Sequence, residues 1–138
     1  MTRRVFLDTN VVLYFVSEAG ARTAIAEQLL MQGGVVSVQV LNELVSAARG
    51  KLNMSWDEVR VAREKTLIFC PDPVSLTEDL HRSAVEISAR YGFHIYDSLI
   101  LAAAMEAGCT TLLTEDMQDG QVVDGVRIEN PFLPASHL

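Results

Sequence analysis

Residues 5–10 of the chain are Val5-Phe6-Leu7-Asp8-Thr9-Asn10, three apolar side chains followed by three polar ones. A short apolar run bounded by polar residues is typical of a buried β-strand, so we predict a strand over 5–7 that ends at Asp8. The rest of the chain must then supply the other strands of the sheet and the helices that cover it.

Short apolar runs continue to alternate with longer segments of helical spacing. Strands are predicted at 35–38, 67–70, 110–114 and 126–129. Helices are predicted at 20–31, 39–49 and 96–107, each closed by a nearby glycine, and two more begin at capping boxes that start at Ser55 and Ser75. Because strands separated by helices need crossover connections, the predicted fold is α/β, a doubly wound α/β/α sandwich with a mostly parallel sheet of four to five strands.

The composition is that of a folded globular protein. Of its 138 residues, 49% are hydrophobic and 21% are charged, which is enough apolar material for a core without metal or disulfide cross-links. We therefore predict a single domain over 1–138. The net charge of −7 excludes nucleic-acid binding through overall charge, so any such contact needs a local basic patch or a metal-filled site.

Two further expectations concern the cellular compartment. Cys70 and Cys109 lie in apolar surroundings and lack metal-ligand spacing, so we expect both to be reduced core residues, with a disulfide as the alternative. No apolar stretch has the length of a signal peptide or of a membrane span. We therefore expect a cytoplasmic protein without membrane contact.

Carboxylates stand where a parallel α/β sheet binds its ligands, beyond the carboxyl ends of the strands. Two follow predicted strands, and two lie in the early turns of predicted helices. These four residues are Asp8, Glu43, Asp97 and Asp116, with Asp119 three residues further on. The doubly wound topology is expected to bring them to one edge of the sheet.

Each of these residues has an ordinary explanation when it is taken alone. Asp8 could cap a helix, Asp97 could favour the positive end of a helix dipole, and Glu43 could be solvated. Taken together, clustered carboxylates repel one another unless a cation is present. Oxygen ligands without a histidine or cysteine favour Mg²⁺ or Mn²⁺ over zinc, and such a site suits phosphodiester hydrolysis.

Four segments resemble the motifs of PIN domains, and most of all those of VapC-type ribonuclease toxins of bacterial toxin–antitoxin pairs. They are Val5-Phe6-Leu7-Asp8-Thr9-Asn10, Leu41-Asn42-Glu43-Leu44, Tyr96-Asp97-Ser98-Leu99-Ile100-Leu101-Ala102-Ala103-Ala104 and Leu112-Leu113-Thr114-Glu115-Asp116. With the order of the elements, the resemblance covers nearly the whole chain. It implies a PIN-like fold and a metal-dependent endoribonuclease that acts on single-stranded RNA.

The resemblance also assigns roles to the acidic residues. It implies a catalytic set of Asp8, Glu43, Asp97 and Asp116, in which Asp8 is a metal ligand and Glu43 and Asp97 hold or orient metal and water. Metal ligands are expected at Asp8, Asp97, Asp116 and Asp119. The chain departs from the family at Met117-Gln118-Asp119-Gly120, where many relatives have an aromatic residue, so Asp119 could support or replace Asp116. Asn10 and Thr114 match polar positions beside the ligands.

Basic residues cluster in one short stretch after Glu43. Arg49, Lys51, Arg60 and Arg63 are the candidate substrate-binding residues, because RNA binding needs cationic contacts to phosphates. Acidic residues are interleaved with them, so the alternative is a solvated face of mixed charge.

The resemblance further implies a homodimer and a small cognate antitoxin that occupies a groove near the site. The mean hydropathy of +0.21 is compatible with an exposed protein interface. The competing hypothesis is a PIN-like module that binds RNA or protein without cleaving. Loss of metal binding would favour that hypothesis.

Overall fold

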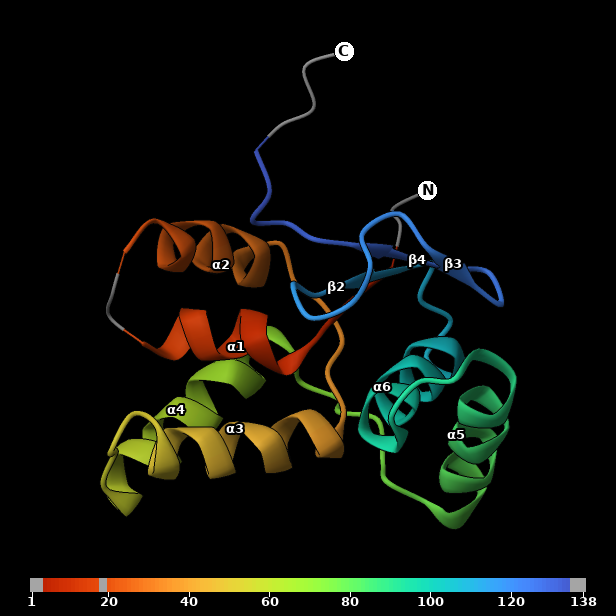
Figure 1. Ribbon diagram of the computed structural model, residues 1–138. Coiled ribbons are helices and arrows are strands. Elements are labelled where there is room, and N and C mark those ends of the chain that lie inside the picture. Colours follow the sequence, from red (N-terminus) through yellow and green to blue (C-terminus); the bar gives the residue numbers. More distant parts are fainter. Residues whose placement is uncertain (1–3, 18–19, 135–138) are drawn as a thin grey trace.

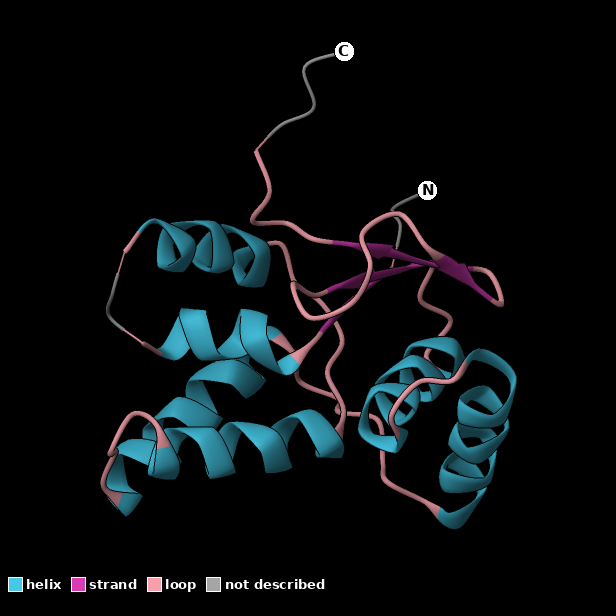
Figure 2. Ribbon diagram, viewed as in Figure 1, coloured by secondary structure: helices cyan, strands magenta, loops and turns pink. Residues whose placement is uncertain are grey.

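The structure is a computed structural model that describes residues 4–17 and 20–134 (Figures 1 and 2). Its elements in chain order are β1 (Val5–Leu7), α1 (Thr9–Val16), α2 (Ala21–Met31), α3 (Val38–Gly50), α4 (Trp56–Phe69), α5 (Glu78–Tyr91), α6 (Ile95–Glu106), β2 (Thr111–Leu113), β3 (Val122–Val123) and β4 (Val126–Glu129). Figure 1 shows α1 to α4 gathered on one side of the molecule and the pair α5 and α6 on the other.

The strands form one sheet in the order β1-β2-β4-β3. β1 pairs with β2 and β2 with β4 in parallel, whereas the short β3 pairs antiparallel with β4. This arrangement confirms the predicted α/β fold with a mostly parallel sheet. The register sets Leu7 opposite Leu113, so β1 and β2 end level with each other. The segments that follow these two strands therefore start side by side.

The predicted strand over 35–38 is reduced to isolated bridges. Val35 makes a parallel bridge to Phe6 of β1, and Ser37 makes one to Val74. α3 begins at the next residue, and the Ser37 hydroxyl accepts a hydrogen bond from the Val40 amide as its N-cap. The helix cap thus ends the extended segment before it can pair further.

The predicted strand over 67–70 is wrong, because α4 continues through Phe69. The capping box between Ser55 and Glu58 forms as predicted. Leu67 and Phe69 pack against the core from helical positions. A short apolar run fits either a buried strand or a buried helix end, and here the contacts of α4 with the rest of the core decide.

Two elements were not predicted. α1 is apolar on nearly all sides, so it lacks the spacing that marks an amphipathic helix, and its cap is Asp8. β3 has only two residues and lacks a periodic pattern. Missing α1 matters most, because this helix carries the side chains that follow Asp8.

α6 forms the centre of the core, as its uniform apolarity predicts. Residues 98–104 are all buried, and the helix lies against β2 and β4 on one side and α5 on another. Cys70 and Cys109 are both buried free thiols, and burial raises the pKa of Cys70 to about 11. Within the described ranges, no helix combines the length and apolarity needed to cross a membrane.

The predicted capping box at Ser75 is wrong by two residues. The N-cap of α5 is Thr77, whose Oγ1 accepts a hydrogen bond of 3.1 Å from the Leu80 amide. Ser75 and Glu78 match the capping-box spacing, but the chain becomes helical only at Glu78.

Replacement of the actual cap should therefore destabilise the protein, and replacement of the apparent one should not. We expect Thr77→Ala to lower the free energy of unfolding by about 1 kcal/mol, since the Leu80 amide loses its acceptor. Urea unfolding measures this change, with Ser75→Ala as the matched control. Equal destabilisation by both variants would contradict the assigned cap.

Candidate active site

Asp8 is a buried carboxylate at the carboxyl end of β1. It is the N-cap of α1, and its Oδ1 accepts from the Thr9 amide at 2.7 Å. Its Oδ2 accepts from Thr114 Oγ1, directly after β2, at 2.8 Å. Burial raises the pKa of Asp8 from 3.8 to about 7; the two hydrogen bonds lower it, and the charges of Glu43 and Asp116 raise it further. Asp8 thus caps a helix and also faces the other carboxylates.

Asn10 and Thr114 connect Asp8 to Asp116. Asn10 Nδ2 donates to Thr114 Oγ1 at 2.9 Å and to Asp116 Oδ2 at 3.2 Å. The Asp116 amide donates to Thr114 Oγ1 at 3.1 Å. Two carboxylates far apart in sequence are therefore held in one hydrogen-bonded chain through an amide and a hydroxyl.

Glu43 is half-buried in α3 and is not a solvated surface residue. Thr9 Oγ1 donates to its Oε1 at 2.9 Å, and Gln39 Nε2 donates to its Oε2 at 2.9 Å. Gln39 was not predicted as a site residue. It lies one helical turn before Glu43, and this i, i+4 spacing is the signal that could have indicated it.

Asp97 approaches the same cluster from the first turn of α6. Its side chain is half-buried, and burial is the main cause of its raised pKa. The charges of Asp116 and Glu43 raise the pKa further, whereas His94, the N-cap of α6, lowers it. The charges of Glu43 and Asp116 thus act on both Asp8 and Asp97, so the four carboxylates of the predicted catalytic set lie within electrostatic range of one another.

An acidic cleft of about 490 Å³ opens beside these residues. We use this name for the space lined by Thr9, Asn10, Leu13, Tyr14, Ser17, Glu43, Ala47, Lys51, Leu52, Glu115 and Asp116. Its walls come from α1, α3 and the segment after β2, which are far apart in the sequence. Its charge favours cations.

The donor set fits a hard divalent cation that retains much of its own water. Within 4–17 and 20–134, no three His, Cys, Asp or Glu side chains converge closely enough to hold an ion by themselves. Mg²⁺ commonly takes one or two protein carboxylates and keeps several waters. Asp8 and Asp116, joined through Thr114 and Asn10, supply two carboxylates without a nitrogen or sulfur competitor.

Asp119 does not join the four carboxylates. It is exposed, and its Oδ1 accepts a hydrogen bond of 2.8 Å from the Asn130 amide. The neighbouring charges that act on Asp8 and Asp97 come from Glu43, Asp116 and His94. The structure thus places Asp119 in a loop contact and not in the predicted ligand set.

The four predicted substrate-binding residues all lie in the described part of the chain. The structure disperses them. Lys51 lines the acidic cleft. Arg49 donates to the Met54 carbonyl and lies over the Trp56 ring, 4.6 Å from its centroid. The other two are exposed on α4 and pair locally, Arg60 with Asp57 and Arg63 with Glu64. For Arg60 and Arg63 the structure matches the solvated face of mixed charge.

Tyr14 and Glu115 line the cleft and were not predicted. Tyr14 OH lies 2.8 and 2.9 Å from the two carboxylate oxygens of Glu115. Tyr14 follows Asn10 by four residues, so both project from one face of α1 toward the segment after β2. This signal could be recognised only once residues 9–16 were known to be a helix.

The raised pKa of Asp8 predicts how the metal-free protein responds to pH. Asp8 is protonated in the folded state below about pH 7 and in the unfolded state only below about pH 4. Its contribution to stability is therefore complete at low pH and is lost as the pH rises through 7. The difference corresponds to roughly 4 kcal/mol at full ionisation.

We expect Asp8→Asn to raise the melting temperature of metal-free protein by several degrees at pH 8 and to change it much less at pH 5. Thermal unfolding in EDTA measures both values. The comparison of the two proteins at each pH removes the contribution of the other carboxylates. A melting temperature of Asp8→Asn below that of the wild type at pH 8 would contradict the unfavourable burial of this charge.

Solved structures of similar fold include a toxin and a toxin–antitoxin complex. A toxin–antitoxin complex from Klebsiella pneumoniae matches 93% of this chain and 98% of its own, with a TM-score of 0.71 and 19% identity. Mycobacterium tuberculosis VapC20, described as a sarcin-ricin loop cleaving toxin, matches 78% of this chain and 86% of its own, with a TM-score of 0.66 and 19% identity. FitAcB from Neisseria gonorrhoeae matches 93% and 98%, with a TM-score of 0.63 and 18% identity. At these identities the likeness establishes the fold.

The sequence comparison establishes the family. No curated protein matched the chain by sequence. The sequence model described as "PIN domain" matches residues 5–118, which begin at β1 and include all four clustered carboxylates. The match and the fold agree with the resemblance carried by the four motifs, and the chain belongs to the PIN domain family.

Proposed function

We propose that this protein is an endoribonuclease that cleaves single-stranded RNA with Mg²⁺ or Mn²⁺ and serves as the toxin of a toxin–antitoxin pair. The observation that carries the proposal is the hydrogen-bonded chain from Asp8 through Thr114 and Asn10 to Asp116, with the charges of Glu43 and Asp116 acting on Asp97. Membership of the PIN domain family, a nuclease family, supports the reaction class. Its substrate would place its action in the cytoplasm.

Some residues of the site would bind a cation, and others hold the side chains of these ligands in place. Asp8 and Asp116 are the proposed principal ligands, with Asp97 beside them. A bound divalent ion would lower the pKa of a water molecule and neutralise charge that develops on the phosphodiester. Thr114 fixes Asp8 Oδ2, and the Thr9 amide fixes Asp8 Oδ1, so this carboxylate keeps one orientation.

Glu43 is proposed to orient the attacking water. Both of its oxygens accept hydrogen bonds, one from Thr9 and one from Gln39, which fix the plane of the carboxylate. A carboxylate oxygen has more than one acceptor direction, so each can still accept from a water molecule. Lys51, across the same cleft, is the proposed contact to an RNA phosphate.

The Asp97→Asn variant tests the reaction. The substitution preserves shape while removing one charge, so we expect the fold to remain and RNA cleavage to fall at least about a hundred-fold. Cleavage of labelled single-stranded RNA with Mn²⁺, with Mg²⁺ and with EDTA measures the effect. Asp79→Asn, an exposed aspartate in the first turn of α5, is the matched control.

The outcomes separate the proposal from its alternative. Cleavage that requires metal and is lost in Asp97→Asn but not in Asp79→Asn supports the enzyme. Full activity of a folded Asp97→Asn variant would overturn the assigned site. If the wild type neither cleaves nor shows Asp97-dependent heat of Mn²⁺ binding, the PIN-like binding module becomes the better description.

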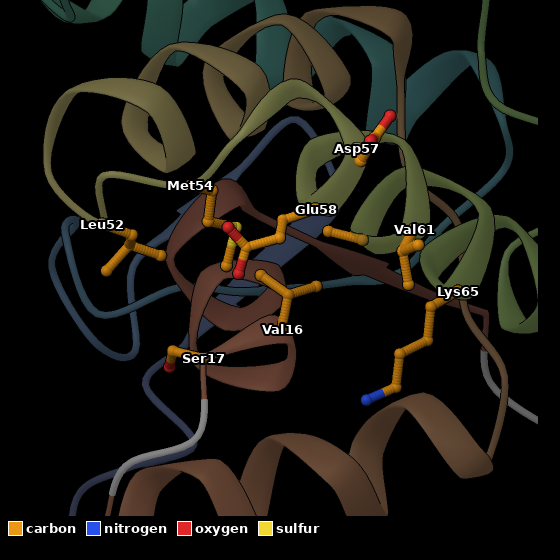
Figure 3. A pocket seen from close by; sticks show the side chains of 9 residues that line it. Val16, Ser17, Leu52, Met54, Asp57, Glu58, Val61 and Lys65 are labelled. Atoms are coloured by element: carbon orange, nitrogen blue, oxygen red, sulfur yellow. The ribbon is translucent and has the colours of Figure 1, made fainter.

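A groove beside the cleft, with exposed apolar side chains among charged ones, is the proposed antitoxin surface. It is lined by Val16, Ser17, Leu52, Met54, Asp57, Glu58, Val61, Ala62 and Lys65, and its volume is about 710 Å³. Figure 3 shows these side chains coming from the end of α1, the α3–α4 connection and α4. Ser17 and Leu52 also line the acidic cleft, so the two spaces are neighbours.

The position of the groove suggests how a partner could inhibit the enzyme. Leu52 and Val61 are 39% and 67% exposed, so an apolar segment of the antitoxin would remove them from water. A segment seated there would also contact Ser17 and Leu52, which line the acidic cleft. Among the similar solved structures are a toxin–antitoxin complex from Klebsiella pneumoniae and VapBC2 from Rickettsia felis bound to a DNA fragment from their promoter. We also propose a homodimer, which analytical ultracentrifugation tests.

A charge in the groove should separate antitoxin binding from catalysis. We expect Val61→Glu to weaken binding of the cognate antitoxin at least about ten-fold while RNA cleavage stays unchanged. Isothermal titration calorimetry measures the affinity. Ile68→Glu is the control, because Ile68 is 73% exposed on the same helix and does not line the groove. Equal weakening by both variants would exclude the groove as the specific surface.

A further inference from the structure

The loop over 115–119, which follows β2, carries Asp116 between two anchored ends. Asp116 itself is exposed, and Asn10 is its side chain's hydrogen-bond donor, at 3.2 Å. The Asp116 amide donates to Thr114 Oγ1 at 3.1 Å, but on the carboxylate itself the bond from Asn10 leaves an exposed side chain room to move. The contacts of its neighbours, Glu115 and Asp119, restrict it.

The near end of the loop is tied to α1. Tyr14 OH donates to the Glu115 carboxylate, 2.8 and 2.9 Å from its two oxygens. The Glu115 amide donates to Asn10 Oδ1 at 3.2 Å. Both the side chain and the backbone of the residue before Asp116 are thus held by residues one helical turn apart.

The far end of the loop is tied to the segment after β4. Asp119 Oδ1 accepts from the Asn130 amide at 2.8 Å, and Asn130 Oδ1 accepts from the Phe132 amide at 2.9 Å. The Phe132 ring packs edge-on against Tyr14, with the ring centroids 5.0 Å apart. The two ties therefore meet at Tyr14 and close a ring of contacts around the loop.

We propose that Tyr14 and Asp119 are positioning residues that brace the loop from both ends and so fix the Asp116 carboxylate. This inference rests on the proposed function, because it treats Asp116 as a metal ligand. It explains why Asp119 lies apart from the four carboxylates. It also assigns a role to Asn130 and Phe132, which lie beyond the 5–118 match to the PIN domain family.

A bracing hydrogen bond and a metal ion require different chemical groups at position 119. To accept the Asn130 N–H, the side chain needs only an oxygen, which asparagine also has. To bind Mg²⁺ or Mn²⁺, a carboxylate with its charge is strongly preferred. Asp119→Asn should therefore behave like the wild type, whereas Asp119→Ala should release the loop.

The matching variant at the near end is Tyr14→Phe, which removes the hydroxyl and keeps the ring contact with Phe132. Tyr91→Phe is its control, because Tyr91 OH also donates to a carboxylate, that of Asp124, at 2.8 Å. The Tyr91 bond joins the end of α5 to the β3–β4 turn, away from the cleft residues. Circular dichroism checks that each variant folds.

Three measurements on the full chain test the brace. Amide hydrogen exchange on metal-free protein should be faster over 115–119 in Tyr14→Phe and Asp119→Ala than in the wild type. Mn²⁺ affinity, measured by calorimetry, should fall about ten-fold in both variants. With RNA, kcat should fall about ten-fold while KM changes less than about two-fold, since the substrate contacts remain. Tyr91→Phe and Asp119→Asn should match the wild type in all three.

Each contrary result has a separate meaning. Unchanged exchange and Mn²⁺ affinity in Tyr14→Phe and Asp119→Ala would overturn the brace. Loss of Mn²⁺ affinity in Asp119→Asn would make Asp119 a ligand and also overturn it. A wild type that binds Mn²⁺ but cleaves no RNA would count against the proposed function, while the exchange and affinity measurements would still decide on the brace.

Discussion

The parallel pairing of β1 with β2 is the constraint on which the site depends. The register sets Leu7 opposite Leu113, and the Asp8 amide donates to the Leu113 carbonyl at 3.1 Å. Asp8 and Thr114 are therefore adjacent, and their side chains form a hydrogen bond of 2.8 Å. A shift of one residue in this register would turn Asp8 or Thr114 to the opposite face of the sheet. The arrangement of Asn10 and Asp116 follows from this single contact.

The position of Asp8 has a thermodynamic cost that a cation can offset. Its carboxylate is buried at the start of a helix, and burial outweighs the helix-capping hydrogen bond in its effect on the pKa. A folded protein that holds this charge near Glu43 and Asp116 is less stable than one without it. Binding of a divalent ion to the folded state would recover stability through mass action. The site thus favours cation binding over maximal stability of the metal-free chain.

Two neighbouring spaces share lining residues at the end of α1 and in the α3–α4 connection. The acidic cleft holds carboxylates and Lys51, and the groove presents Leu52 and Val61 to solvent beside Asp57, Glu58 and Lys65. Because the spaces share Ser17 and Leu52, the proposed antitoxin surface adjoins the proposed catalytic cleft. In a protein of net charge −7, such a local arrangement is a more plausible basis for recognition than overall charge.

The fold class, most of the helices and the four candidate carboxylates could be predicted from the sequence, because strand-end position and helical spacing are local patterns. The sequence by itself did not determine α1, the helical end of α4 or the cap at Thr77, since these depend on contacts with the rest of the core. The roles of Gln39, Tyr14 and Glu115 and the separation of Asp119 from the cluster were decided by tertiary structure. Hydrogen bonds between residues about a hundred positions apart, such as Thr114 to Asp8, form only after the parallel sheet has brought the strand ends together.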